Sequence, residues 1–81
     1  MKVLSRAFDT WLRHRMGWIR LEELEPGKVY LWRIQWPVNH VIHYNYTVLD
    51  VAKTINNMKE TFDEIPEGVW VWHNDKFSRL V

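Results

Sequence analysis

The segment His40-Val41-Ile42-His43 is the part of this chain that most resembles a metal site. Imidazole nitrogens bind zinc, copper and other transition metals. The run is rich in β-branched and aromatic residues, and in a strand two rings three residues apart point to opposite faces of the sheet. The pair therefore cannot bind one ion together, and His14 and His73 are distant in the sequence. We predict no metal site and no cofactor.

The carboxylates and hydroxyls do not form a catalytic pattern either. Acidic side chains gather in residues 22–25 and 60–67, beside a turn and at a helix end. Carboxylates there are usually solvated and lack the burial that raises the pKa of a catalytic acid. Ser5 and Ser78 lie outside any nucleophile-elbow motif, and the three glycines stand apart, so no phosphate-binding loop is present. The sequence predicts a protein that is not an enzyme.

Tryptophan is the most informative component, with six in 81 residues. Indoles fill small cores, and they also anchor protein interfaces together with tyrosine and arginine. A domain of this size without cysteine depends on its core, because no disulfide can stabilise it. Core packing is therefore the simplest role for most of the indoles. Six indoles nevertheless exceed what a small two-layer core readily hides, so we predict at least one that is exposed and functional.

The elements that position these residues follow from periodicity. Apolar residues at helical spacing predict a helix over residues 4–16, ending at Gly17, with Lys2, Arg6 and Arg13 on its opposite side. Thr47 is the predicted N-cap of a second helix. Its buried stripe comprises Val48, Val51, Ala52, Ile55, Met58, Lys59 and Phe62.

Alternation of apolar and polar residues predicts the strands. Two of them, residues 29–36 and 38–46, form a hairpin, and two more, residues 69–73 and 76–81, join across Asn74-Asp75. In the first strand Trp32 and Trp36 face one way and Arg33 the other. A small extra strand is predicted at residues 18–21. The fold class is α+β in one domain over 1–81: two layers, a four-stranded antiparallel sheet with two helices, in the order α-β-β-α-β-β.

These observations favour a small binding module in the cytoplasm, one that inhibits or modulates a partner protein. Small phage or plasmid proteins that disable a host enzyme have this general character, although no motif here matches a particular family. No apolar run is long enough to span a membrane. The oligomeric state stays open. The candidate partner-binding residues are Arg6, Arg13, Trp32, Trp36, Trp70 and Trp72.

The alternative is a nucleic-acid-binding regulator that uses the aromatic strands and the basic first helix. Residues 1–20 carry five basic side chains and one acidic one, whereas the whole chain has a net charge of only +1. A charge this close to zero offers little counterion release. Arg33 is predicted to point to the face opposite Trp32 and Trp36, so the arginine and these indoles would not form one nucleic-acid-binding surface.

Overall fold

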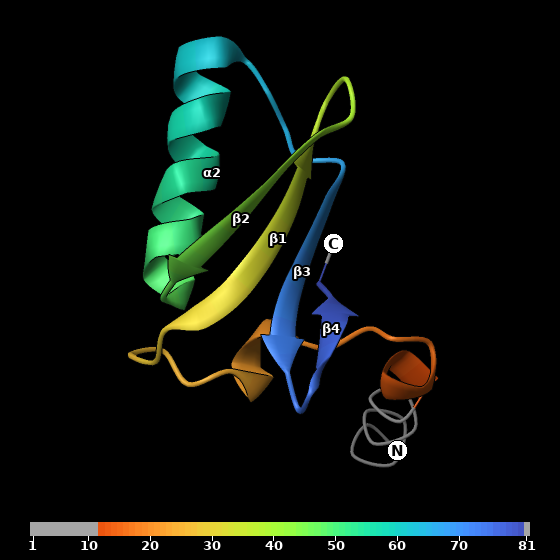
Figure 1. The fold of residues 1–81 in the computed structure, drawn as a ribbon. Coiled ribbons are helices and arrows are strands. Elements are labelled where there is room, and N and C mark those ends of the chain that lie inside the picture. The colour runs from red at the N-terminus through yellow and green to blue at the C-terminus, as the bar shows by residue number, and fades with distance from the viewer. Residues whose placement is uncertain (1–11, 81) are drawn as a thin grey trace, which may run out of the picture.

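The structure is a computed structural model that describes residues 12–80. Its elements are the short 3-10 helix η1 (Leu21–Glu23), the strands β1 (Tyr30–Trp36) and β2 (His40–Tyr46), the helix α2 (Val48–Phe62), and the strands β3 (Gly68–His73) and β4 (Lys76–Arg79). The four strands form one antiparallel sheet in the order β2-β1-β3-β4, and α2 lies on one side of it (Figure 1). The predicted two-layer α+β fold is confirmed. Most of the predicted first helix lies outside the described residues, and residues 12–15 are helical.

Strand register divides the sheet into two unlike faces. Directly opposed residues of an antiparallel pair share a face, and Trp32 of β1 is opposed by Tyr44 of β2 and by Val71 of β3. This side is the core face, and it faces α2. The buried apolar residues are Ile19, Leu24, Tyr30, Trp32, Ile34, Trp36, Val51, Val69 and Val71.

Helix α2 begins with the predicted cap. The Thr47 hydroxyl accepts a hydrogen bond from the Asp50 amide (3.2 Å), and the Asp50 carboxylate accepts one from the Thr47 amide (3.1 Å). The predicted buried stripe is too long, because only Val51 is buried and Phe62 is 62% exposed. Periodicity identifies which face of a helix is apolar, but it does not say how many turns have a sheet beneath them.

The two hairpins have different turns. Asn74 and Asp75 join β3 to β4 with φ of 52° and 61°, the left-handed pair that suits a two-residue turn and that these residue types tolerate. Residues 37–39 join β1 to β2, so β2 begins at His40 and not at Val38. Val38 has φ of 63° and is 93% exposed. A β-branched residue in this conformation is strained.

The predicted strand over residues 18–21 is wrong. Trp18 makes one isolated parallel bridge with Arg79, and η1 follows. The bridge region is held by the Arg79 amide donating to the Gly17 carbonyl (2.7 Å) and the Ile19 amide donating to the Arg79 carbonyl (2.9 Å). The chain then turns into η1 because the Glu23 carboxylate accepts a hydrogen bond from the Arg20 amide (2.7 Å).

Candidate protein-binding face

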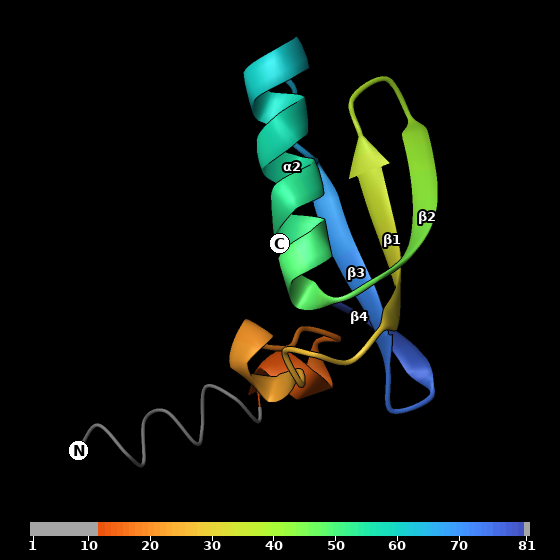
Figure 2. The same ribbon diagram turned by 90° about the vertical axis from the view of Figure 1, so that its left-hand side faces the viewer.

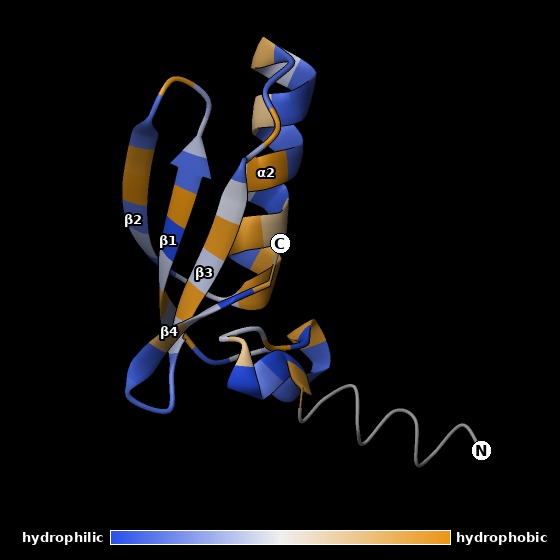
Figure 3. Ribbon diagram, turned by 90° about the vertical axis from the view of Figure 1, so that its right-hand side faces the viewer, coloured by the Kyte–Doolittle hydropathy of each residue, from blue (hydrophilic) through white to orange (hydrophobic). Residues whose placement is uncertain are grey.

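The second face of the sheet, here the open face, points away from α2. Figures 2 and 3 show α2 on one side of the sheet only, with residues 12–29 near one end of the strands and toward that same side. Within residues 12–80, then, no helix lies over the open face. Its strand positions, which include no Asp or Glu, are Leu31, Arg33, Gln35, Val41, His43, Asn45, Gly68, Trp70, Trp72, Phe77 and Arg79.

Trp70 is the centre of a stack of rings and guanidinium groups on this face. The Arg33 guanidinium lies 4.7 Å from the centroid of the Trp70 ring, and that of Arg79 lies 4.9 Å from it. Arg79 also lies 5.0 Å from the Trp18 ring, so the order across the face is Arg33, Trp70, Arg79, Trp18. Such contacts are worth about 0.5–2 kcal/mol each, depending on exposure, and they fix the direction of the guanidinium N–H donors.

Gly68 makes room for this arrangement. A Cβ atom at residue 68 would lie 2.4 Å from Cη2 and 2.5 Å from Cζ3 of Trp70, so the indole rests directly over the glycine backbone. A glycine inside a strand commonly marks a close approach of this kind. Arg79 is tied to the same region, since its guanidinium donates to the Glu67 carbonyl (3.1 Å). The stack is therefore held in place by the glycine backbone beneath Trp70 and by the hydrogen bond from Arg79 to the Glu67 carbonyl.

Beside the stack lies an exposed aromatic pair. Trp72 is 44% exposed, and its ring meets the edge of Phe77 on β4 at 5.1 Å between centroids. The ring of His43 on β2 lies 6.3 Å from Phe77. These side chains combine an apolar surface with N–H donors, as interface hot spots do.

The predicted site residues fall into separate places. Trp32 and Trp36 are 1% and 2% exposed and belong to the core, where the Trp32 indole donates to the Tyr46 carbonyl (2.8 Å). A partner cannot reach them without opening the core. Trp70 and Trp72 lie together on the open face. Arg6 lies outside the described residues.

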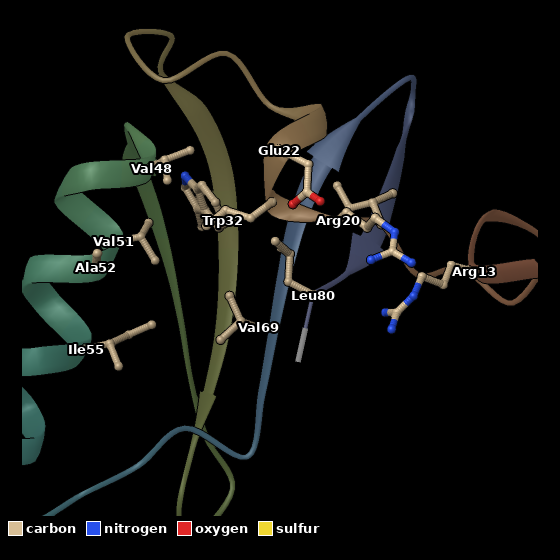
Figure 4. Close-up of a pocket in the computed structure, with 12 residues that line it drawn as sticks. Arg13, Arg20, Glu22, Trp32, Val48, Val51, Ala52, Ile55, Val69 and Leu80 are labelled. Carbon is tan, nitrogen blue, oxygen red and sulfur yellow. The ribbon is translucent and has the colours of Figure 1, made fainter. Parts of the chain in front are cut away.

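Arg13 lines an apolar cavity of about 390 Å³ between α2, the core face and residues 19–22. Figure 4 shows Arg13, Arg20 and Glu22 at one side of it and α2 at the other. The lining residues are Arg13, Ile19, Arg20, Leu21, Glu22, Trp32, Val48, Val51, Ala52, Ile55, Val69 and Leu80. Pockets of this size and lining can take small apolar ligands. The spacing of Arg13 predicts a place on the solvated side of the first helix. In the structure Arg13 instead lines this cavity.

The sequence reasoning missed four residues of this arrangement: Arg33, Arg79 and Phe77 on the open face, and Trp18, whose ring lies beside Arg79. Alternation places Arg33 correctly on the side opposite Trp32. It does not reveal that β3 pairs with β1 so that Trp70 is opposed to Arg33. A signal for this pairing would have to come from the register between strands that are far apart in the sequence.

Away from the open face, the carboxylate of Glu23 is held by hydrogen bonds from the Arg20 amide and from His14. Burial by itself raises the pKa of Glu23, but hydrogen bonds from the Arg20 amide and from His14, with the charges of His14 and His73, outweigh it, so the pKa is lowered. The His14 Nε2 to Glu23 Oε1 distance is 2.5 Å.

In the part of the chain that the structure describes, no three His, Cys, Asp or Glu side chains form a group able to hold a metal ion. No helix within residues 12–80 is long and apolar enough to cross a membrane.

Comparison with known proteins gives no relative: no family model, no curated protein and no solved structure matches this chain.

Proposed function

We propose that this protein is a non-catalytic module that binds a partner protein through the open face and thereby inhibits or modulates it. The observation that carries the proposal is the exposed Trp72 beside the Arg33–Trp70 stack. Exposed indoles and arginines with fixed side chains lose little conformational entropy when a partner binds. A cysteine-free chain is also consistent with a cytoplasmic location, since small secreted domains usually carry disulfides.

The charge on this face indicates what kind of surface would fit it. Arg33 and Arg79 supply positive charge, the strand positions of the face hold no carboxylate, and the Glu67 carboxylate at its edge accepts a hydrogen bond from Gln35 (3.3 Å). A partner with carboxylates around an apolar pocket would be complementary, because the indole fills the pocket while the guanidinium groups meet the acids. We therefore expect an acidic protein surface.

A matched pair of variants tests the proposal. Arg33→Gln with Trp72→Ala removes the two features from the open face, and Lys53→Gln with Leu49→Ala removes exposed residues of α2. We expect affinity capture from the native cell to recover one partner with the wild type and with the α2 variant, in the presence of nuclease. The open-face variant should lose it while keeping its circular dichroism spectrum. Equal recovery by all three proteins would refute the proposal.

Nucleic acid is the second candidate, and one observation favours it. Arg33 lies on the same face as Trp70 and Trp72 and stacks on Trp70, which places a cation and an exposed ring together as in single-strand binding surfaces. Fluorescence anisotropy with a labelled oligothymidylate tests this. Binding that weakens steeply with salt and is lost in the open-face variant would favour nucleic acid over protein.

A further inference from the structure

The two edges of the sheet differ. The outer edge of β4 is closed by the segment before η1, since the Arg79 amide donates to the Gly17 carbonyl (2.7 Å) and the Ile19 amide donates to the Arg79 carbonyl (2.9 Å). The sheet ends at β2 on its other side, and Figures 2 and 3 show no segment of residues 12–80 beyond that strand. β2 has seven residues and β4 has four, so the longer edge is the one left open.

Hydrogen bonding inside the sheet shows which backbone groups of β2 point to this open edge. The Gln35 carbonyl accepts a hydrogen bond from the Glu67 amide (2.7 Å), so the backbone groups of Gln35 point toward β3. Successive residues of an antiparallel strand bond to opposite sides, so Ile34 bonds to β2, where Ile42 opposes it. Ile42 therefore points inward and its neighbours point outward. The residues whose N–H and C=O groups face the open edge are Val41, His43 and Asn45.

β2 carries none of the features that usually protect an exposed edge. It contains no Lys, Arg, Asp, Glu or Pro, and its ladder to β1 runs over all seven residues without a bulge. On the core face its side chains Ile42, Tyr44 and Tyr46 are only half-buried, and no described strand lies beyond them. An apolar row that stops at an open edge favours a further strand with the same pattern.

We propose that the open edge of β2 pairs with β2 of a second copy of this chain, antiparallel and about a two-fold axis at His43. This register opposes His43 to His43 of the partner subunit and Val41 to Asn45 of the partner subunit, so every outward-pointing residue finds a hydrogen-bonding partner. On the core face it opposes Ile42 to Tyr44 of the partner subunit, a pair of β-branched and aromatic side chains that stabilises sheets.

Other registers fit less well. A shift of one residue would set core-face side chains of one copy beside open-face side chains of the other. A shift of two residues keeps the faces but leaves Val41 or Asn45 without a strand partner. The fit of β2 to itself in one register is what identifies the occupant as a second copy. The dimer does not depend on the partner-binding role of the open face.

The test uses the full chain in sedimentation experiments at about 1 μM to about 1 mM, the range of dissociation constants for weak association. We expect a reversible dimer. Hydrogen exchange at the amides of Val41, His43 and Asn45 should slow as concentration rises, whereas the amide of Ile42, bonded to β1, should be slow throughout. A monomer at every concentration would overturn the proposal, and so would a dimer in which these three amides exchange as in the monomer. Slowing that requires a different protein from the native cell would assign the edge to a partner's strand instead.

Variants test the register. His43→Glu opposes two carboxylates at the two-fold axis, and because His43 is exposed the fold should not change. We expect the dissociation constant to rise about fivefold or more. Lys53→Gln on α2 lowers the formal net charge by the same amount and is the matched control, which should dimerise as the wild type does. An unchanged dissociation constant in His43→Glu would refute the register and the dimer with it.

A second set of variants uses opposite charges. Val41→Lys combined with Asn45→Glu sets a lysine of each copy against a glutamate of the other, so the double variant should dimerise more tightly than either single variant. Single variants that dimerise as tightly as the double variant would contradict the pairing of residue 41 with residue 45.

Discussion

At the scale of single residues, the open face depends on the absence of one side chain. Gly68→Ala would place a Cβ atom 2.4 Å from the Trp70 ring, which is held between two guanidinium groups and cannot move without disturbing them. We expect a loss of about 1–3 kcal/mol in the free energy of unfolding, as for other overpacked sites. The near-ultraviolet circular dichroism of Trp70 should change as well. Gly27→Ala is the control, since a Cβ there meets nothing within 4 Å. Equal stability of the two variants would mean that Trp70 is not seated on Gly68.

Val38 shows that strain is retained at an exposed position. Its left-handed φ of 63° costs a β-branched residue about 1–2 kcal/mol of stability. Glycine adopts this conformation without strain, but it makes the unfolded chain more flexible, so Val38→Gly would recover only part of that cost. We expect Val38→Gly to raise the free energy of unfolding by roughly 0.5–1 kcal/mol in urea titrations. Asn39→Gly should change it less, because asparagine tolerates this conformation. Destabilisation by Val38→Gly would contradict the left-handed turn. Strain at an exposed apolar residue is often functional, so loss of partner binding in this variant would add the hairpin tip to the interface.

At the scale of elements, two carboxylates that accept hydrogen bonds at the start of a helix, Asp50 of α2 and Glu23 of η1, predict how stability responds to acid. The backbone and hydroxyl hydrogen bonds of Thr47 lower the pKa of Asp50 from its ordinary value of 3.8, and the pKa of Glu23 is lowered from 4.5. A lowered folded-state pKa stabilises the protein above the unfolded value and loses that stabilisation as pH falls through the folded value. We expect the free energy of unfolding to fall below about pH 4.5. Asp50→Asn and Glu23→Gln should each reduce this slope in urea titrations at pH 3–6. An unchanged slope in both variants would contradict the two caps.

Helix α2 is expected to be held to the sheet mainly by its first half. Ile55 packs partly buried against the core, whereas Phe62 is 62% exposed. We expect Ile55→Ala to cost about 2 kcal/mol, the lower end of the range for such truncations, and Phe62→Ala to cost less than about 1 kcal/mol. The predicted stripe assigns both residues to the core, so the pair of measurements separates periodicity from packing. A larger cost at Phe62 than at Ile55 would show that the last turn of the helix is covered.

At the scale of the whole molecule, association should depend on local rather than net charge. The net charge is +1, yet Arg33 and Arg79 face outward on a surface without strand carboxylates. For an acidic partner we expect Arg33→Glu to lower the association rate constant and to reduce its dependence on salt. Lys53→Glu, an equal change of charge on α2, should alter the rate far less. The comparison needs stopped-flow or surface-based kinetics at low and high ionic strength. Identical effects of the two variants would indicate that only the overall charge matters.

Two basic residues of the predicted first helix, Arg6 and Arg13, are also predicted partner-binding residues. Lys2 and Arg6 lie outside the described residues, and Arg13 lines the apolar cavity. Arg13 is half-buried, so a variant with Lys2, Arg6 and Arg13 all changed to Glu would not probe an exposed surface alone. The open face, where Trp72 is exposed, is therefore the better-supported place for the proposed partner contact.

The sequence by itself determined α2, the four strands of the sheet and the two faces of each strand, but not η1. Alternation in residues 30–36 separates Trp32 from Arg33, Thr47 with Asp50 marks the start of α2, and Asn74-Asp75 marks the last turn. All three depend on local geometry, since side-chain direction, capping and turn conformation are set by residues a few positions apart.

Only the tertiary structure decided which faces meet. The pairing of β1 with β3 opposes Arg33 to Trp70, buries Trp32 against Val71 and leaves Trp72 exposed. The bridge between Trp18 and Arg79 joins residues that are 61 positions apart. Hydrophobic alternation is the same for every strand of a two-layer sheet, so it cannot choose between neighbours, and a register shift of two residues would keep each face while changing every contact. The site therefore arises from long-range pairing, for which this sequence carries no local signal.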